Sequence, residues 1–268
     1  MAIAAPPVIT SSDIVAALRA LGVEPSDTLF VHADVRCALR VAGDSIERKV
    51  DTLIDALDAA VPRGVLAMPT FTYSFCRGEQ FDVDATPSTV GLLSERFRRR
   101  PGVRRTVDPI FSAALRGTLP DAWERDLFEP GDQDCFGERS VFALLRESRA
   151  KLAFAGAGFE YCTFVHHVEQ QLRVPYRYPK DFTGKVVSGG AAHDVRARYF
   201  VRRLDEDVET LLGPLGDALL AGGGARRAVL AGGLPLIVAE AAAVEAVACR
   251  RLADNPDFLL ERGHPGGP

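Results

Sequence analysis

Residues 27–68, DTLFVHADVRCALRVAGDSIERKVDTLIDALDAAVPRGVLAM, decide the fold class. They begin with an apolar run over Asp27–His32 that is typical of a buried strand. Helical spacing of apolar residues then covers Ile46–Ala60, and a second buried strand follows over Val65–Met68. A helix that joins two strands in this way lets them pair in parallel. The segment therefore predicts an α/β fold with a central, mostly parallel sheet flanked by helices.

The alternation of strands and helices continues along the chain. Polar Thr10–Asp13 precede an expected helix over Ile14–Leu21, and Ser or Asp at this place can cap it. The next expected elements are a helix Val90–Arg100, a strand Phe111–Arg116, a helix Val141–Glu147, a strand Lys151–Ala157 and a helix Thr163–Leu172. This order is the one that α/β proteins show.

The C-terminal third is expected to add strands and then helices. These elements are strands around Val187–Val201 and helices over Val208–Leu220 and Pro235–Arg251. No internal repeat or linker divides the chain, so we expect one domain over residues 1–268. Its two ends lack periodicity, which predicts flexibility at 1–8 and 262–268.

The composition excludes several classes of protein. The 268 residues carry a formal net charge of −4, so the chain lacks the basic footprint of a nucleic-acid-binding domain. No apolar run reaches the length of about 18 residues that spans a membrane. The five cysteines include no Cys-x-x-Cys pair, which argues against a zinc site or a disulfide framework. With no secretory signal, we expect a cytoplasmic enzyme with neither membrane nor nucleic acid as partner.

Arginines gather in two stretches. They are Arg96, Arg98, Arg99, Arg100, Arg104 and Arg105 in the first, and Arg196, Arg198, Arg202 and Arg203 in the second. A solvated helix face explains such a run. A patch that binds phosphates is the alternative, because the guanidinium fork matches phosphate geometry.

Two loops that follow expected strands carry candidate binding residues. Residues 31–36, VHADVR, could offer backbone N–H groups to a ligand, although a capped turn with His32 packed among its neighbours explains them too. Residues 68–75, MPTFTYSF, combine hydroxyls with aromatic rings that can stack on a sugar or base, or they extend a half-buried strand. Ligands gather at the carboxyl ends of parallel strands, so both loops are candidates for one site.

A third segment, CTFVHHVE over Cys162–Glu169, carries the strongest catalytic signal. Residues three apart share a helix face, which places Thr163, His166 and Glu169 on one stripe. A carboxylate beside an imidazole fixes the tautomer of the ring and raises its basicity. That arrangement suits a general base that takes a proton from an attacking amine.

Other interpretations of this segment stay open. His-His-x-Glu could bind a metal, but adjacent histidines diverge on a helix, so His167 is expected to face elsewhere. His166 could also have a purely structural capping role. Asp108, ahead of the strand at Phe111, could bind an ammonium group, position His166 or hold a turn. The ATP phosphate loop and the Gly-x-Ser-x-Gly nucleophile elbow are both absent from the sequence.

Taken together, four segments resemble the aminoglycoside 3-N-acetyltransferase family. They are LGVEPSDTLFVHADV (Leu21–Val35), GVLAMPTFTYSF (Gly64–Phe75), TPSTVGLLSERFRRRPGVRRTVDPIFSAALRG (Thr86–Gly117) and FAGAGFEYCTFVHHVEQ (Phe154–Gln170). The resemblance implies an α/β acyltransferase fold that differs from the common acetyltransferase superfamily. It also implies acetyl-CoA or another acyl-CoA as donor, a small-molecule amine as acceptor, and no metal.

The resemblance also implies roles for individual residues. The family's Thr-x-x-His-x-x-Glu pattern falls on Thr163, His166 and Glu169, which makes His166 the general base. Thr70 is expected to supply an oxyanion donor, with Asp108 as a further catalytic residue. The coenzyme A arm is expected to contact His32, Ala33, Asp34, Val35, Arg36, Phe111 and Ser112. The acceptor is expected to contact Thr72, Tyr73, Phe75, Thr163 and Tyr176.

One departure from the family guides the choice of acceptor. Aminoglycoside-modifying members resemble His-Pro-Thr-His-Ser where this chain has DPIFS over Asp108–Ser112. The chain resembles relatives that acylate nucleotide-linked amino sugars, and arginine-rich stretches suit such anionic substrates. We therefore expect transfer of an acetyl or short hydroxyacyl group to a nucleotide-linked aminodeoxy sugar. The alternatives are an aminoglycoside 3-N-acetyltransferase that gives resistance and a non-catalytic protein that binds coenzyme A or a nucleotide.

The apolar stretch Ile237–Val247 could serve as the interface of a homodimer.

Overall fold

A seven-stranded sheet forms the centre of the molecule. The computed structural model describes residues 8–204 and 208–262. In spatial order the strands are β11 (Ala225–Leu230), β12 (Leu234–Glu240), β7 (Lys151–Ala155), β1 (Thr28–Ala33), β2 (Val65–Pro69), β5 (Ala113–Arg116) and β4 (Arg104–Arg105). The three central strands β7, β1 and β2 pair in parallel, and the strands outside them pair antiparallel. The predicted α/β class is confirmed, with parallel pairing confined to the middle of the sheet.

Helices cover both faces of this sheet. They are α1 (Ser11–Ala20), α2 (Ile46–Ala60), α3 (Leu92–Arg98), α4 (Asp121–Phe128), α5 (Val141–Glu147), α6 (Phe164–Leu172), α7 (Gly213–Ala221) and α8 (Ala241–Asp254). Buried side chains of α1 to α3 join one hydrophobic cluster, and those of α4 to α8 join the other. Strand β1 alternates between them, because Leu29 and Val31 point into the first cluster and Phe30 into the second.

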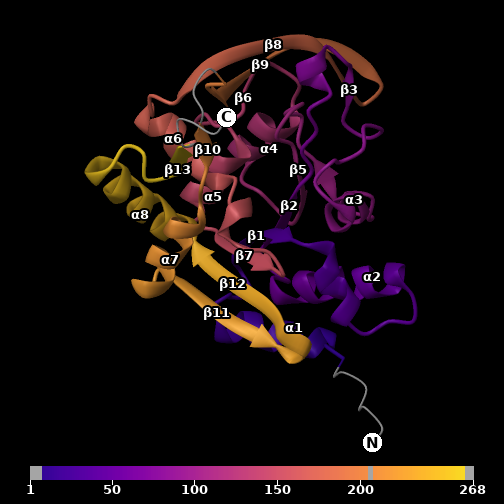
Figure 1. Cartoon of the computed structure of the whole chain (residues 1–268). Coiled ribbons are helices and arrows are strands. Elements are labelled where there is room, and N and C mark those ends of the chain that lie inside the picture. The colour runs from indigo at the N-terminus through magenta and orange to yellow at the C-terminus, as the bar shows by residue number, and fades with distance from the viewer. Residues whose placement is uncertain (1–7, 205–207, 263–268) are drawn as a thin grey trace, which may run out of the picture.

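A smaller sheet lies across one end of the molecule. Its strands are β3 (Phe81–Asp82), β8 (Arg177–Ser188), β9 (Ala191–Arg202) and β6 (Gln133–Asp134), in that order. Strands β8 and β9 form a long antiparallel hairpin that arches over the top of the view in Figure 1. A separate pair, β10 (Val208–Thr210) with β13 (Leu260–Arg262), lies near the base of this hairpin.

Most predicted elements in the first two thirds of the chain are confirmed. The helix over Ile46–Ala60 has the bounds expected, and α1 begins at a capping box between Thr10 and Asp13. The loop after β1 contains a short 3-10 helix, Val35–Arg40. No helix in the described parts of the chain is long and apolar enough to cross a membrane. The predicted flexible ends lie outside the described residues, except for residues 8 and 262.

The C-terminal third differs from the prediction. The expected helix over 235–251 is strand β12 followed by helix α8, and the expected helix over 208–220 begins as strand β10. Short apolar runs fit a strand or a helix equally well, so pairing with β7 decides the outcome. Part of the apolar stretch Ile237–Val247, which was a candidate for a dimer interface, packs within the chain, because Ile237 and Val244 are buried.

Gly117, directly after β5, has a backbone conformation and a close neighbour that leave no room for a side chain. Its φ is +133°, and a Cβ there would lie 2.5 Å from the Gly64 carbonyl oxygen. We expect Gly117→Ala to lower the free energy of unfolding by roughly 2 kcal/mol or more, measured by urea titration. Gly131→Ala is the control, since nothing lies within 4 Å of a Cβ there. Equal unfolding midpoints for both variants would contradict this account.

Candidate active site

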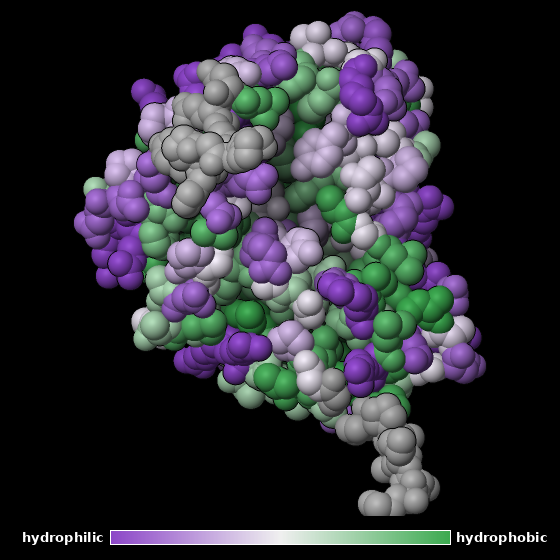
Figure 2. Space-filling view, viewed as in Figure 1, coloured by the Kyte–Doolittle hydropathy of each residue, from purple (hydrophilic) through white to green (hydrophobic). Residues whose placement is uncertain are grey.

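A cavity of about 270 Å³ opens where the three parallel strands end. Its walls come from the ends of β1 and β2, from the segment between β7 and α6, and from β10. The lining residues are His32, Ala33, Pro69, Phe71, Tyr73, Val90, Ser94, Glu160, Tyr161, Cys162, Thr163, His166, Thr210 and Leu212. Figure 2 shows a recess in the upper half of one face, where polar and apolar residues are mixed. The site thus lies at the carboxyl ends of parallel strands, where α/β proteins bind ligands.

His166 and Glu169 form a hydrogen-bonded pair on the first turns of α6. His166 Nδ1 lies 2.6 Å from Glu169 Oε2, across the i, i+3 spacing that the sequence predicts. The imidazole is 19% exposed and lines the cavity, whereas the carboxylate is fully buried. The Phe136 ring packs edge-on against the imidazole, with 5.5 Å between centroids. Packing and hydrogen bonding therefore hold the ring of His166 in one orientation.

Glu169 is an ionised carboxylate despite its burial. Tyr176 donates its hydroxyl to Oε1 at 3.0 Å, and Arg177 Nε lies 2.8 Å from Oε2. Burial acts to raise the pKa of Glu169, but His166, Arg177 and Tyr176 together hold it below its usual range. An ionised carboxylate only accepts hydrogen bonds, so Nδ1 of His166 carries the proton that lies between the two side chains.

His166 is a neutral imidazole with one nitrogen available. Burial lowers its pKa, the charge of Arg177 lowers it further, and Glu169 opposes both effects. With the proton on Nδ1, Nε2 carries a lone pair and makes no hydrogen bond with any described residue. A neutral imidazole held by a carboxylate and open to a cavity can accept a proton from a bound nucleophile.

His167 has a different environment, as the helical geometry predicts. Its Nδ1 donates to the Phe136 carbonyl oxygen at 2.8 Å, and its side chain is buried. The two adjacent rings therefore point to different partners. Within residues 8–204 and 208–262, no group of three or more His, Cys, Asp or Glu side chains is placed to hold a metal ion.

The structure brings some of the predicted binding residues to this cavity. His32, Ala33, Tyr73 and Thr163 line it together with His166. Tyr176 lies behind the wall and reaches the cavity only through Glu169. These residues come from four separate segments, which the parallel arrangement of β1, β2 and β7 brings together.

Other predicted residues of the first loop lie outside the cavity and hold the backbone. Asp34 caps the 3-10 helix by accepting from the Arg36 N–H at 2.8 Å, and it also pairs with the exposed Arg36 side chain. Val35 begins that helix and packs partly buried against the core. This arrangement is the capped turn that the sequence offered as an alternative.

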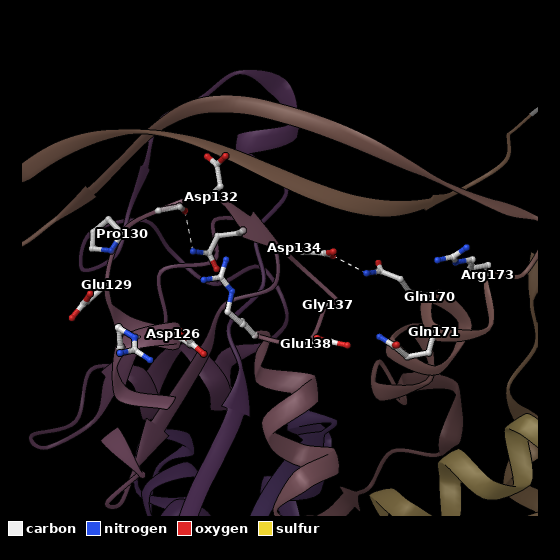
Figure 3. Close-up of a pocket in the computed structure, with 14 residues that line it drawn as sticks. Asp126, Glu129, Pro130, Asp132, Asp134, Gly137, Glu138, Gln170, Gln171 and Arg173 are labelled. Atoms are coloured by element: carbon white, nitrogen blue, oxygen red, sulfur yellow. Dashed lines mark hydrogen bonds and ion pairs between the residues drawn. The ribbon is translucent and has the colours of Figure 1, made fainter. Parts of the chain in front are cut away.

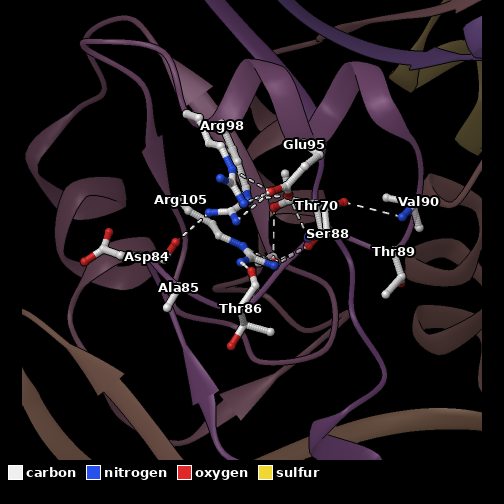
Figure 4. A network of polar contacts seen from close by, with 12 residues as sticks. Thr70, Asp84, Ala85, Thr86, Ser88, Thr89, Val90, Glu95, Arg98 and Arg105 are labelled. Atoms are coloured by element: carbon white, nitrogen blue, oxygen red, sulfur yellow. Dashed lines mark hydrogen bonds and ion pairs between the residues drawn. The ribbon is translucent and has the colours of Figure 1, made fainter.

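Thr70 and Ser112 bind each other instead of facing the cavity. Both are fully buried, the Thr70 N–H donates to the Ser112 carbonyl oxygen at 2.8 Å, and the two hydroxyls lie 3.2 Å apart. Arg105 donates to the Thr70 carbonyl oxygen at 2.6 Å and to Ser112 Oγ at 3.0 Å, and Figure 4 shows it beside the Arg98–Glu95 ion pair. This network fixes the loop after β2, on which Tyr73 reaches the cavity.

Four further predicted residues shape the same loops from inside. Asp108 accepts from the N–H groups of Ile110 and Phe111, each at 2.8 Å, and so holds the turn before β5. The Phe111 ring packs edge-on against Phe71, with 5.1 Å between centroids. Thr72 lies 3.3 Å from Ser74 through its hydroxyl, and buried Phe75 closes a short turn beneath β8.

The arginine-rich stretches are mostly engaged in ion pairs. The pairs of the first stretch are Arg96 and Arg100 with Asp51, Arg98 and Arg99 with Glu95, and Arg104 with Glu124. In the second, Arg196 pairs with Asp132 and Arg198 with Asp181. These contacts explain the arginines as links between elements, and they remove the argument for an anionic acceptor.

Several residues of the site were not singled out in the sequence. Among them, Arg177 contacts both His166 and Glu169, Thr210 lines the cavity, and Phe136 packs on His166. Arg177 directly follows Tyr176, an expected acceptor contact, and this position in the sequence is the signal that could have pointed to it. Thr210 lies where a helix was expected, and nothing in the sequence marks Phe136.

His32 links the site to the stability of the fold. Its ring stacks on Phe154 with 5.4 Å between centroids, and burial lowers its pKa to about 3. In the unfolded chain a histidine has a pKa near 6.5, so the unfolded state binds more protons as the pH falls from about 6.5 toward 3.

The variant His32→Phe, which keeps a ring against Phe154, tests this effect. It should reduce the loss of stability at acid pH and change the stability little above pH 7. Urea titrations at pH 8 and pH 5 measure the free energy of unfolding of the wild type and of His32→Phe. An equal loss of stability between pH 8 and pH 5 in both proteins would contradict this prediction.

Comparisons with known proteins agree with this geometry. A family model described as aminoglycoside 3-N-acetyltransferase matches residues 30–253. The chain is 31% identical over 183 residues to aminoglycoside N(3)-acetyltransferase IV of Salmonella sp, an alignment that spans 66% of each chain. It is 28% identical over 202 residues to aminoglycoside N(3)-acetyltransferase VII of Streptomyces paromomycinus, across 68% of this chain and 67% of that enzyme.

Solved structures show the same fold over nearly the whole chain. Aminoglycoside acetyltransferase AAC(3)-Xa superposes with a TM-score of 0.76 at 22% identity, covering 94% of both chains. AAC-IIIb, solved as a binary complex with CoASH, has a TM-score of 0.74 at 23% identity and covers 97% of this chain and 100% of its own. YokD of Bacillus subtilis has a TM-score of 0.74 at 19% identity, covering 93% and 94%.

These findings confirm part of the functional prediction and correct the rest. The predicted family, N-acyltransferase class and acetyl-CoA donor are confirmed. The nucleotide-linked amino sugar is wrong as acceptor, because the family model and both curated relatives are aminoglycoside N(3)-acetyltransferases. The local resemblance over Asp108–Ser112 had pointed to the wrong acceptor. In the structure, Asp108 accepts hydrogen bonds that hold a turn there. The chain belongs to the aminoglycoside 3-N-acetyltransferase family, whose members are acyl-CoA-dependent N-acetyltransferases.

Proposed function

We propose that this protein transfers the acetyl group of acetyl-CoA to an amino group of an aminoglycoside and thereby confers resistance. The observation that carries the proposal is the neutral imidazole of His166. Its Nδ1 is held by Glu169 at 2.6 Å, while its Nε2 is free at the wall of a cavity. Family membership supplies the donor and the class of acceptor.

The chemistry follows from the protonation state of His166. Nε2 removes a proton from the acceptor's amine as the amine nitrogen attacks the thioester carbonyl carbon. A C–N bond forms, the C–S bond breaks, and the proton passes from Nε2 to the departing thiolate sulfur. Glu169 stabilises the imidazolium that exists between these steps, because its negative carboxylate accepts the hydrogen bond from Nδ1–H throughout.

A carboxylate-lined groove next to the catalytic helix supports a polycationic acceptor. The groove has a volume of about 780 Å³ and contains five carboxylates against three arginines. The carboxylates are Asp126, Glu129, Asp132, Asp134 and Glu138. Figure 3 shows the groove beneath β8 and β9, with Asp134 hydrogen-bonded to Gln170 of α6 at 2.7 Å. Gln170 lies about one helical turn beyond His166, so the same helix contributes to the groove and to the cavity.

Substitution of His166 tests the chemistry. We expect His166→Ala to lower kcat by about 10²–10⁴-fold, because the proton acceptor is lost, while acetyl-CoA affinity persists. Thiol release with apramycin, gentamicin and sisomicin measures turnover, and calorimetry measures donor binding. His193→Ala, on β9 away from the cavity, is the control and should keep wild-type rates. An unchanged rate for His166→Ala would refute this mechanism, and a wild-type protein that binds acetyl-CoA without turnover would favour a binding role.

The groove provides a second test, on affinity for the acceptor. Glu129 and Glu138 are exposed and pair with no described residue. We expect the double variant Glu129→Gln, Glu138→Gln to raise the KM for the aminoglycoside roughly two- to tenfold at low salt, with kcat retained. Glu47→Gln, at an exposed position of α2, is the control. The difference should shrink in high salt, and a KM equal to that of the control would exclude the groove as acceptor site.

A further inference from the structure

The guanidinium of Arg177 connects the catalytic pair to the smaller sheet. It is 4% exposed at the start of β8, with Nε 2.8 Å from Glu169 Oε2 and Nη2 3.1 Å from His166 Nδ1. Nη2 also donates to Thr210 Oγ1 at 3.4 Å, and Nη1 donates to the Phe200 carbonyl oxygen at 3.3 Å. One buried cation therefore touches α6, β9 and β10 at once, directly behind the general base.

We propose that Arg177 is a positioning residue that keeps His166 in its neutral, proton-accepting form by sharing the Glu169 carboxylate with it. The proposal rests on the proposed function, because His166 must be a general base for its neutral form to matter. Arg177 itself does not line the cavity, and it acts on the reaction through Glu169 and His166.

The net charge of the buried group formed by Arg177, Glu169 and His166 depends on whether His166 is protonated. Arg177 contributes +1 and Glu169 contributes −1, so the three side chains are neutral overall when His166 is uncharged. Protonation of His166 would place a second positive charge about 3 Å from Arg177, in a region with little water. Like charges at this distance disfavour the protonated form. Without Arg177, the buried Glu169 carboxylate would lack a permanent counter-ion, and His166 would provide one by taking a proton.

The other ionisable groups around His166 do not replace Arg177 in this role. Burial raises the pKa values of Tyr73 and Cys162 to about 12 each, raises those of Tyr176 and Tyr199 above their usual range, and lowers that of His32 to about 3. Glu160 and Tyr161 also line the cavity, and Glu160 accepts from the Gly158 N–H at 3.1 Å. His166 is therefore the group of this site whose protonation Arg177 opposes directly, because Arg177 Nη2 lies 3.1 Å from its Nδ1.

The first experiment compares the pKa of His166 in the wild type and in Arg177→Met, by NMR titration of the imidazole in the full chain. We expect the pKa to rise by about one unit or more in Arg177→Met, and by less in Arg177→Lys, which keeps the charge. Arg198→Met is the control, because Arg198 is on the same hairpin but pairs with exposed Asp181, and it should titrate as the wild type does. An unchanged or lower pKa in Arg177→Met would overturn the proposal.

The pH dependence of kcat/KM supplies the second readout. In Arg177→Met, the acidic side of the pH profile of kcat/KM should move to higher pH. If Arg177 were only structural, its loss would lower kcat/KM at every pH and leave the position of the acidic side unchanged. If Arg177→Met does not fold, Glu169→Gln tests the same balance: the Arg177 charge then lacks its counter-ion, and the His166 pKa should fall below that of the wild type. A His166 pKa that does not fall in Glu169→Gln would overturn the proposal. The NMR titration needs no acceptor, so it can succeed even if the proposed function fails.

Discussion

A carboxylate with no solvent contact imposes the main constraint on this site. Glu169 is fully buried and ionised, and such a charge is destabilising unless donors surround it. The chain supplies two hydrogen-bond donors, from Tyr176 and His166, and one ion-pair partner, Arg177, and these groups lie on α6 and on the segment that begins β8. This buried charge therefore ties the start of the small sheet to the helix that carries His166.

The central sheet determines where that charge acts. Strands β7, β1 and β2 run in parallel, so the segments that follow them meet at one edge and enclose the cavity. Antiparallel strands on both sides extend the sheet without adding to this wall. The loop after β2 holds its shape through Thr70, Ser112 and Arg105, all of them buried, and its exposed Tyr73 then faces the cavity. Buried polar groups in this protein thus shape the cavity wall from behind.

The sequence contained enough local information to predict the pairing of His166 with Glu169 and the parallel core. His166 and Glu169 interact within one helical turn, and the strands of the core read as buried apolar runs. Thr70 and Asp108 could not be assigned correctly, because a hydroxyl or carboxylate after a strand looks the same whether it faces a ligand or its own backbone. The contact between Arg177 and Glu169 depends on where β8 begins. Strand β12 could not be told from a helix, since only its pairing with β7 distinguishes the two.

The groove and the catalytic pair differ in how freely they can vary during evolution. Glu129 and Glu138 are exposed and make no contact with described residues that a substitution would break, so surface changes there alter stability little. The buried group around Glu169 tolerates substitution less well. Replacing any one of its side chains leaves a buried polar or charged partner without its contact. Under the proposed function, the range of acceptors can therefore drift through single surface mutations in the groove, while the buried group that would carry the chemistry stays fixed.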